Sequence, residues 1–290
     1  MKVLVTGCSG FSGSLIAKEF SSYFDIYGIY RNEKSKYLRN LDNTSLKLFN
    51  LDLNKIHTLN KKIKEIDIVI HIGSTSPNNK INNQKLLDDN INATTKLINW
   101  SIKKKCKKFI FFSSMSAFGD VTAKVVNEKT PSINPDFYGL TKLIIEKILY
   151  ENRTILPSVS IRLPGIIGPG SKRNWLSNLK QDIICNKKIK IFNPESYFNN
   201  LIHIDDLTQL LKNILNIDFT YEIILVGTKQ KIKIKEVTNV LLNELNYKSI
   251  IEFDSIKKNS FLIDSNKAMK KFNFCPKHIK ISLEKFAHEN

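Results

Sequence analysis

The chain has 290 residues, of which 42% are hydrophobic. This length and composition suffice to bury a sizeable core, which argues against a disordered protein and allows one large α/β unit or a medium domain with a smaller partner. No apolar run approaches the roughly 20 residues that span a bilayer, and the strand-like start MKVLVTG leaves no room for a signal peptide. We expect a cytoplasmic protein that makes no use of a membrane.

The formal net charge of +18 raises the question of a nucleic-acid partner, because basic surfaces attract phosphates. Lysine, however, is spread over the whole chain and does not alternate with aromatic side chains as on a base-stacking surface. The densest run, Lys103–Lys108, falls between a predicted helix and a predicted strand, where lysines favour the negative helix end. We expect no nucleic-acid partner, although surplus positive charge could steer an anionic small molecule to the protein.

Metal ligands and disulfide pairs are not indicated. The four cysteines are widely scattered without a CxxC pair, so free thiols are expected. His203 stands close to Asp205 and Asp206, but two acids that open a helix cap it and complement its dipole. We therefore predict no metal site.

Strand signals alternate with helix signals over the first half of the chain. Helical periodicity marks Asn90–Ile102 and the segment after Pro135. Buried strands are predicted at Val3–Thr6, Ile26–Tyr30, Leu46–Phe49, Ile68–Ile72 and Phe109–Ser113. This rhythm predicts a doubly wound parallel sheet, that is, an α/β fold.

A sixth strand, Val159–Leu163, precedes the turn-rich segment Pro164–Gly170, where the chain should change direction. Beyond it the pattern loosens into short strands and helices. These are strands at Ile189–Phe192 and Ile223–Val226, and helices at Leu176–Cys185, Ile204–Leu215 and Lys235–Asn246. We predict a first domain over residues 1–165 and a smaller mixed α/β domain over residues 166–290, with some segments packing back on the first.

A glycine-rich turn, TGCSGFSG, connects the first strand to a helix. Gly7 permits the tight turn, Gly10 lets backbone N–H groups approach a pyrophosphate, and Gly13 allows close helix–strand packing. Three glycines alone are weak evidence. Their position after the first strand of an alternating α/β chain predicts a dinucleotide-binding turn.

The second strand ends in Tyr30 and Arg31, at the place that meets the adenosine ribose in such folds. A carboxylate there would bond the ribose 2′-hydroxyl and select NAD, whereas an arginine can accept the 2′-phosphate of NADP. NADP(H) is therefore the preferred cofactor and NAD(H) the alternative. The other interpretation of Arg31 is a solvated loop residue that does not contact the cofactor. Asp52 is expected either to contact the adenine edge or to cap the next helix.

Tyr138 and Lys142 share one face of the helix predicted after Pro135. A nearby ammonium favours the ionised form of a tyrosine hydroxyl, so Tyr138 could exchange a proton with a substrate oxygen while Lys142 also holds a ribose. Ser114 ends the strand before this helix, at the edge where doubly wound sheets bind ligands, and could polarise the same oxygen.

Taken together, these segments resemble the extended short-chain dehydrogenase/reductases, the NAD(P)-dependent nucleotide-sugar epimerase/dehydratase family. The resemblance covers nearly the whole chain in order. It rests on TGxxGFxG at Thr6–Gly13, Asp52–Leu53, DIVIHIGS at Asp67–Ser74, NINAT at Asn90–Thr94, SSMSAFG at Ser113–Gly119, YxxxK at Tyr138–Lys142, RLPGIIGPG at Arg162–Gly170, LIHIDDL at Leu201–Leu207 and DSNKAMKKFNFCP at Asp264–Pro276.

The resemblance implies a Rossmann domain followed by a substrate-binding domain, with Ser114, Tyr138 and Lys142 as the catalytic residues. Relatives often dimerise through helices of the first domain, so a homodimer is expected. The implied cofactor contacts are Gly7, Ser9, Gly10, Phe11, Gly13, Arg31, Asp52, Leu53, Asn90 and Lys142.

Departures from the family pattern narrow the reaction. Sugar dehydratases carry an Asp-Glu pair after the catalytic hydroxyl, where this chain has Met115 and Ser116, so 4,6-dehydration is disfavoured. Ser116 also replaces the cysteine of epimerase-reductases of the GDP-fucose synthase kind. Two activities remain, a 4-ketoreductase and a 4-epimerase, and Arg31 favours the reductase. In the reduction, Tyr138 would donate the proton. A non-catalytic NADP-binding regulator on the same fold is a further alternative.

The substrate is expected to be a nucleotide sugar, with a free ketone or aldehyde as the alternative. Gly165 replaces the usual asparagine, and Asn199 replaces the arginine that commonly contacts a diphosphate. Lys172, Arg173 or Lys190 could supply the missing charge. The candidate substrate residues are Ser74, Ser116, Gly165, Lys172, Arg173 and Asn199.

Overall fold

The computed structural model describes residues 1–42, 44–77, 81–247, 250–254, 256 and 260–289. By its internal contacts the chain forms two compact units. The first comprises residues 1–119, 134–162 and 217–224, and the second comprises residues 120–133, 163–216 and 225–290. The predicted boundary near residue 165 stays a prediction.

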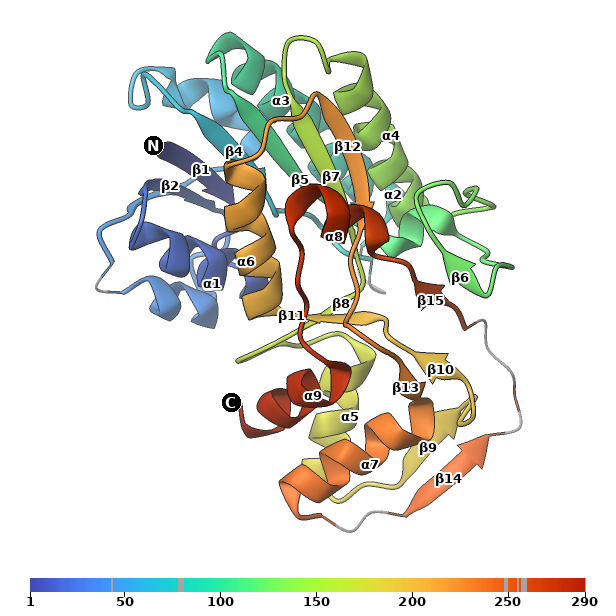
Figure 1. Ribbon diagram of the computed structural model, residues 1–290. Coiled ribbons are helices and arrows are strands. Elements are labelled where there is room, and N and C mark those ends of the chain that lie inside the picture. The colour runs from blue at the N-terminus through green and yellow to red at the C-terminus, as the bar shows by residue number, and fades with distance from the viewer. Residues whose placement is uncertain (43, 78–80, 248–249, 255, 257–259, 290) are drawn as a thin grey trace. The chain divides into compact units, whose positions relative to one another are not determined.

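A seven-stranded sheet forms the first unit, in the order β12-β7-β5-β4-β1-β2-β3, and Figure 1 shows its strands side by side. Pairing is parallel from β3 through β2, β1 and β4 to β5, with Leu4 opposite both Tyr27 and Val69. The strands are β1 (Lys2–Thr6), β2 (Asp25–Tyr30), β3 (Lys47–Asn50), β4 (Ile68–His71), β5 (Lys108–Ser114), β7 (Ser158–Leu163) and β12 (Tyr221–Leu225). The predicted doubly wound α/β fold is confirmed.

The direction of winding reverses between β1 and β4, because the chain builds β2 and β3 on one side of β1 and then crosses over to β4, β5 and β7 on the other. The crevice beyond the carboxyl ends of two such strands is where doubly wound sheets bind ligands. The glycine-rich turn follows β1 and Ser74 follows β4, so both lie at this crevice.

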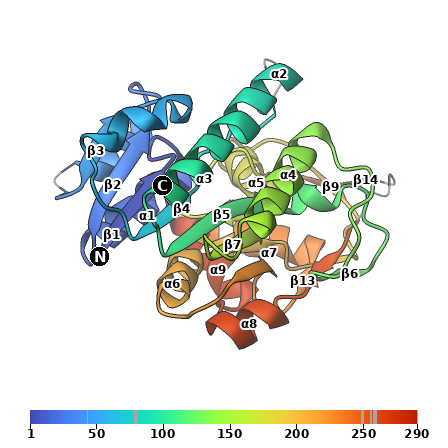
Figure 2. The same cartoon turned by 90° about the horizontal axis from the view of Figure 1, so that it is seen from above.

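The helical elements of the first unit cover the sheet. Leu97 and Ile98 pack with Ile145 and Leu149 in one apolar core that also holds Leu4 of the central strand. Figure 2 shows α3 and α4 over the same face of the sheet. The elements are α1 (Phe11–Ser21), η1 (Lys36–Leu41), η2 (Leu53–Asn60), α2 (Asn83–Leu86), the π-helical turn η3 (Leu87–Asn92), α3 (Ala93–Lys103), η4 (Met115–Phe118) and α4 (Phe137–Glu151).

The second unit is a mixed α/β structure with its own core, in which Ile183, Val237, Leu241 and Leu283 are buried together. Its helices are α5 (Trp175–Ile184), α6 (Ile204–Leu215), α7 (Ile234–Leu245), α8 (Asn266–Phe272) and α9 (Ile279–His288). Its strands form two-stranded pairs: β6 (Val125–Val126) with β15 (Leu262–Ile263), β8 (Gly165–Ile167) with β11 (Leu201–His203), β9 (Ile189–Phe192) with β14 (Ile251–Asp254), and β10 (Tyr197–Phe198) with β13 (Ile232–Lys233).

The start of α6 is capped, and its first turn is acidic as the sequence predicts. His203 caps α6 by accepting a hydrogen bond from the N–H of Asp205, and the two aspartates lie in the first turn of that helix. Within the described part of the chain, no helix combines the length and apolarity needed to cross a lipid bilayer.

Candidate active site

The turn between β1 and α1 leaves no room for side chains at its glycines. Gly7 has φ +77°, and a Cβ on it would lie 2.8 Å from the Cα of Gly73 in the loop after β4. A Cβ on Gly13 would lie 2.2 Å from the carbonyl oxygen of Gly7. These contacts are the close backbone approach expected of a pyrophosphate-binding turn, and Gly10 stands at the N-terminus of α1.

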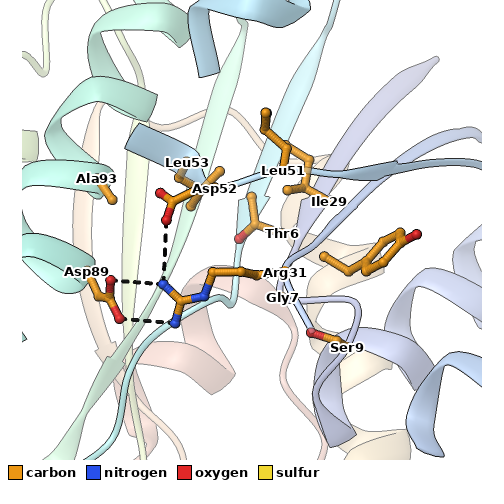
Figure 3. Close-up of a pocket in the computed structure, with 11 residues that line it drawn as sticks. Thr6, Gly7, Ser9, Ile29, Arg31, Leu51, Asp52, Leu53, Asp89 and Ala93 are labelled. Atoms are coloured by element: carbon orange, nitrogen blue, oxygen red, sulfur yellow. Dashed lines mark hydrogen bonds and ion pairs between the residues drawn. The ribbon is translucent and has the colours of Figure 1, made fainter. Parts of the chain in front are cut away.

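A cavity of about 120 Å³ opens beside this turn (Figure 3). Its lining combines the end of β1, the end of β2 and the segment after β3, where the adenosine half of a dinucleotide binds in this type of fold. The glycine cradle and this cavity therefore fit the predicted cofactor. The lining residues are Thr6, Gly7, Ser9, Ile29, Tyr30, Arg31, Leu51, Asp52, Leu53, Asp89 and Ala93.

Arg31 reaches into this cavity but is held there by carboxylates. Its Nη1 and Nη2 donate to the two oxygens of Asp89 at 2.9 and 3.0 Å, and Nη1 lies 3.8 Å from an oxygen of Asp52 (Figure 3). The hydrogen bond to Asp89 raises the pKa of Arg31 above its ordinary value. Asp52 lines the cavity and also caps η2 by accepting from the N–H of Asn54, as one of its two interpretations predicts, while its contact with the adenine edge stays a prediction.

Asp89 is a carboxylate with four donors around it. Besides Arg31, the hydroxyl of Thr75 donates to it at 2.5 Å and the ammonium of Lys85 lies 3.0 Å away. Burial alone would raise its pKa, but the hydrogen bonds from Arg31, Thr75 and Lys85 outweigh burial and lower the pKa of Asp89 to about 2. Asp89 is thus a charged anion throughout the physiological pH range.

Lys142 is buried, with only 3% of its surface exposed. Its Nζ donates to the carbonyl oxygen of Phe112 at 3.0 Å and to the hydroxyl of Ser74 at 3.1 Å. The same Nζ lies 5.3 Å from the centroid of the Tyr138 ring, one turn earlier on α4. The helix therefore places an ammonium directly behind the half-buried tyrosine, as the spacing of four residues predicts.

Ser114 ends β5 and caps the short turn η4. Its Oγ accepts from the N–H of Ser116 at 3.1 Å and donates to the Ser116 hydroxyl at 3.2 Å. A Cβ on Gly139 would lie 2.1 Å from the carbonyl oxygen of Ser116, so the first turn of α4 rests directly on η4. This contact brings the turn that carries Tyr138 against the strand end that carries Ser114.

Asn90 is buried behind this group and ties the loop after β4 in place. Its Oδ1 accepts from the Thr75 N–H at 2.8 Å and from the Ser74 hydroxyl at 3.2 Å, and its Nδ2 donates to the Thr75 carbonyl at 2.9 Å. His71 is packed between the hydroxyls of Thr6 and Thr94. Burial, together with the positive charge of Lys142, lowers the pKa of the His71 ring to about 3, so the ring is neutral.

Comparison with known proteins places the chain in a family. Residues 3–227 match the model of the NAD dependent epimerase/dehydratase family. The chain belongs to this family. The family resemblance inferred from the sequence is confirmed, and so is NAD(P) as the type of cofactor. The choice between NADP and NAD depends on the residues at the adenosine end of the site.

Individual relatives and solved structures show how far the likeness extends. A dTDP-D-glucose 4,6-dehydratase from Dictyostelium discoideum is 26% identical over 83% of this chain, and the match spans 62% of that relative's length. A dTDP-4-dehydro-6-deoxyglucose reductase from Escherichia coli is 24% identical over 94% of this chain and 92% of its own length. The crystal structure of a UDP-glucuronic acid 4-epimerase from Bacillus cereus, in complex with NAD, has a TM-score of 0.85 at 23% identity, covering 99% of this chain and 97% of that one, which shows a shared fold.

Four of the predicted substrate residues, Gly165, Lys172, Arg173 and Asn199, lie in the second unit. Lys172 and Arg173 are exposed, whereas Asn199 is buried and its amide pairs with the backbone of Ile263 through two hydrogen bonds of 2.9 Å. The side chain of Asn199 therefore holds a strand in place, and a role of these four residues in substrate binding stays a prediction.

The second unit also holds an aromatic cavity of about 330 Å³. Trp175 and Phe198 meet edge to face in its wall, with 5.4 Å between their ring centroids. The other lining residues are Phe192, Asn193, Asn200, Ile234, Ser260 and Phe261.

A buried ion pair beneath the site was missed by the sequence reasoning. Glu146 lies one turn after Lys142 on α4 and accepts hydrogen bonds from Arg162 at 3.0 and 2.7 Å and from the Ser113 hydroxyl at 2.6 Å. Both partners of the ion pair are almost fully buried, and Ser113 directly precedes Ser114. One signal in the sequence could have revealed this pair: an acidic residue four positions after Lys142, on the inner face of the same helix.

We expect Glu146→Ala to lower the free energy of unfolding by about 3–5 kcal/mol, because it leaves the guanidinium of Arg162 buried without its counter-charge. Glu151→Ala, on the same helix, removes an exposed ion pair with Lys147 and is the matched control, with little change expected. Chemical denaturation followed by circular dichroism measures both. Equal stability of the two variants would contradict the structural importance of the buried pair.

Proposed function

We propose that this chain is an NADP(H)-dependent oxidoreductase that reduces the 4-keto group of a nucleotide-linked deoxysugar. The observation that carries the proposal is the buried ammonium of Lys142, fixed behind Tyr138 on a helix turn that rests on the strand end bearing Ser114. A lysine is rarely buried without a purpose that offsets the cost of desolvating its charge. Here the charge faces the tyrosine that would handle the proton.

In this proposal the bound dinucleotide supplies the hydride that adds to the carbonyl carbon. Tyr138 donates its hydroxyl proton to the carbonyl oxygen as that oxygen gains negative charge, and the ammonium of Lys142 stabilises the tyrosinate that is left. The Ser114 hydroxyl, whose oxygen accepts from the N–H of Ser116, turns its proton from the Ser116 hydroxyl to the carbonyl oxygen and donates a hydrogen bond there. The products are a secondary alcohol and the oxidised cofactor, and a solvent proton restores Tyr138.

The residues that follow Ser114 support a reaction without water loss. Dehydration of a sugar needs an acid and a base beside the hydride step, and Met115 and Ser116 offer neither at the positions of the dehydratase carboxylates. Ser116 contributes instead to the hydrogen bonding of Ser114. Net reduction of a ketone requires only the groups that this site contains.

The second candidate is an NAD-dependent nucleotide-sugar 4-epimerase. It is favoured by Arg31, whose guanidinium is already paired with Asp89 and therefore offers less attraction to the 2′-phosphate that would distinguish NADP. The NAD complex of the UDP-glucuronic acid 4-epimerase shares the fold of this chain. An epimerase oxidises and re-reduces one carbon, so it gains by retaining NAD, whereas a reductase must exchange its cofactor every turnover.

The aromatic cavity of the second unit supports a nucleotide-linked substrate. Its wall of Trp175, Phe192 and Phe198 presents ring faces and edges, and Asn193 and Asn200 add amide groups that can donate and accept hydrogen bonds. Planar bases bind well to such surfaces, because stacking on aromatic rings is favourable and amides recognise base edges. A free ketone or aldehyde would leave most of this surface without a function.

Purified protein should release little nucleotide on denaturation and should oxidise added NADPH in the presence of a 4-keto nucleotide sugar. Chromatography of the denatured supernatant and absorbance at the reduced-nicotinamide band measure the two quantities. Stoichiometric NAD in the supernatant together with no consumption of NADPH would reject the reductase in favour of the epimerase.

Tyr138→Phe should reduce turnover by about 10²–10⁴-fold, the usual contribution of a positioned proton donor. Its affinity for the cofactor, measured by calorimetry, should stay close to that of the wild type, because the hydroxyl alone is removed. Unchanged turnover would reject the role of Tyr138. A wild-type protein that binds cofactor but turns over no keto sugar would favour a regulatory NADP-binding protein.

We also propose that the protein is a homodimer that pairs through α4. Leu140 and Ile144 are 42% and 41% exposed and lie one turn apart on its outer face. Light scattering should give twice the 33.3 kDa of the chain, and Ile144→Glu should give the monomer. Lys18→Glu, an exposed charge reversal on α1, is the control. A monomeric wild type would contradict the proposal.

A further inference from the structure

The helix that precedes the site contains one turn of unusual pitch. α2, η3 and α3 follow one another without interruption from Asn83 to Lys103, and η3 is a π-helical turn, a local widening that often occurs at functional positions. The wide turn directs two successive residues towards the cofactor side of the unit. Asp89 bonds Arg31 at the end of β2, and Asn90 bonds Ser74, which in turn bonds the catalytic candidate Lys142.

Asp89 binds Arg31 in the geometry that a phosphate would also use. An arginine fork forms two parallel hydrogen bonds with a carboxylate or a phosphate, and here both are already made, at 2.9 and 3.0 Å. The Asp89 side chain is 7% exposed and the Arg31 side chain 50% exposed. The carboxylate is therefore the fixed partner, and the guanidinium is the one that can turn to a ligand.

The charges that line the cavity do not favour a dianion. Among the described residues that line it, Arg31 is the one cation, and Asp52 and Asp89 are anions, so the lining carries a net charge of −1 (+1 − 2). A 2′-phosphate would have to draw Arg31 from Asp89 or share it, and would approach two carboxylates. The ribose hydroxyls of NAD meet neither obstacle, and one of them can donate to Asp52.

We propose that Asp89 is a specificity-determining residue that counterbalances Arg31 and keeps the preference of this chain for NADP over NAD small, so that both cofactors bind. The inference rests on the proposed function, in which Arg31 faces the adenosine ribose. Asp89 acts by competing with the 2′-phosphate for the guanidinium, and Lys85 and Thr75 keep its carboxylate in place when Arg31 turns away.

Calorimetric titration with NADP⁺ and with NAD⁺ tests the inference on the full chain. Asp89→Asn should raise the affinity for NADP⁺ relative to NAD⁺ by about tenfold, the effect of removing one competing charge-assisted pair. Asp88→Asn removes the same charge one residue earlier, where the carboxylate contacts Gln84 and Asn92, and is the matched control. The affinity ratio of this control should change by less than about threefold, because its carboxylate bonds Gln84 and Asn92, and a charge further from the guanidinium is screened by salt.

A double-mutant cycle separates the inference from the proposed function. Arg31→Ala should lower the NADP⁺ affinity selectively, and Asp89→Asn in that background should no longer change the ratio. The inference is wrong if Arg31→Ala shifts the affinity ratio and Asp89→Asn leaves it unchanged. It is also wrong if Asp89→Asn lowers the NADP⁺ affinity as Arg31→Ala does, because Asp89 then does not compete with the phosphate. If Arg31→Ala leaves the ratio unchanged, the NADP assignment of the proposed function fails. Thermal melts verify folding, and Asp89→Ser replaces Asp89→Asn should the latter not fold.

Discussion

The buried ammonium of Lys142 is the interaction on which the site depends. A desolvated charge is costly unless its hydrogen bonds are made, so the Nζ of Lys142 has to find acceptors within the protein. It finds one near the carboxyl end of β5, at Phe112, and another in the loop after β4, at Ser74. One cation thus joins helix α4 to two strand ends, and these are the ends between which a doubly wound sheet binds its ligand.

The charged groups of the first unit differ in their partners and, at Arg31, in their exposure. Glu146 and Arg162 neutralise each other in the core, where an unpaired charge would be most costly. Lys142 stands one helical turn closer to the crevice and has neutral acceptors, so its charge remains available to Tyr138. Arg31 and Asp89 lie at the partly exposed adenosine end, where an ion pair can exchange partners. Chemistry and cofactor recognition thereby use charges of different accessibility.

Much of this arrangement is local in origin and therefore readable in the sequence. The central strands are apolar runs, the glycine turn has its own spacing, and the pair Tyr138 and Lys142 follows from helical periodicity. Two pairings of the site are not local: Asp89 is 58 positions from Arg31, and Glu146 is 16 positions from Arg162. Arg31 could be assigned to the adenosine end from its strand, but the carboxylate that meets it comes from another element. Short strands such as β8 and β11, and the C-terminal helix α9, were likewise missed because they are specified by packing in the second unit.

The wide turn η3 also sets how many residues of this helix can face the sheet. A π-helical turn holds one residue more than an α-helical turn, because its hydrogen bonds span five residues instead of four. A single deletion between Leu87 and Asn92 would restore the α-helical pitch, so that Asp89 and Asn90 could not both face the sheet, and either the partner of Arg31 or the support of Ser74 would be lost. In this segment a change of one residue in length is therefore more disruptive than most substitutions, and variation among relatives should preserve its length before its composition.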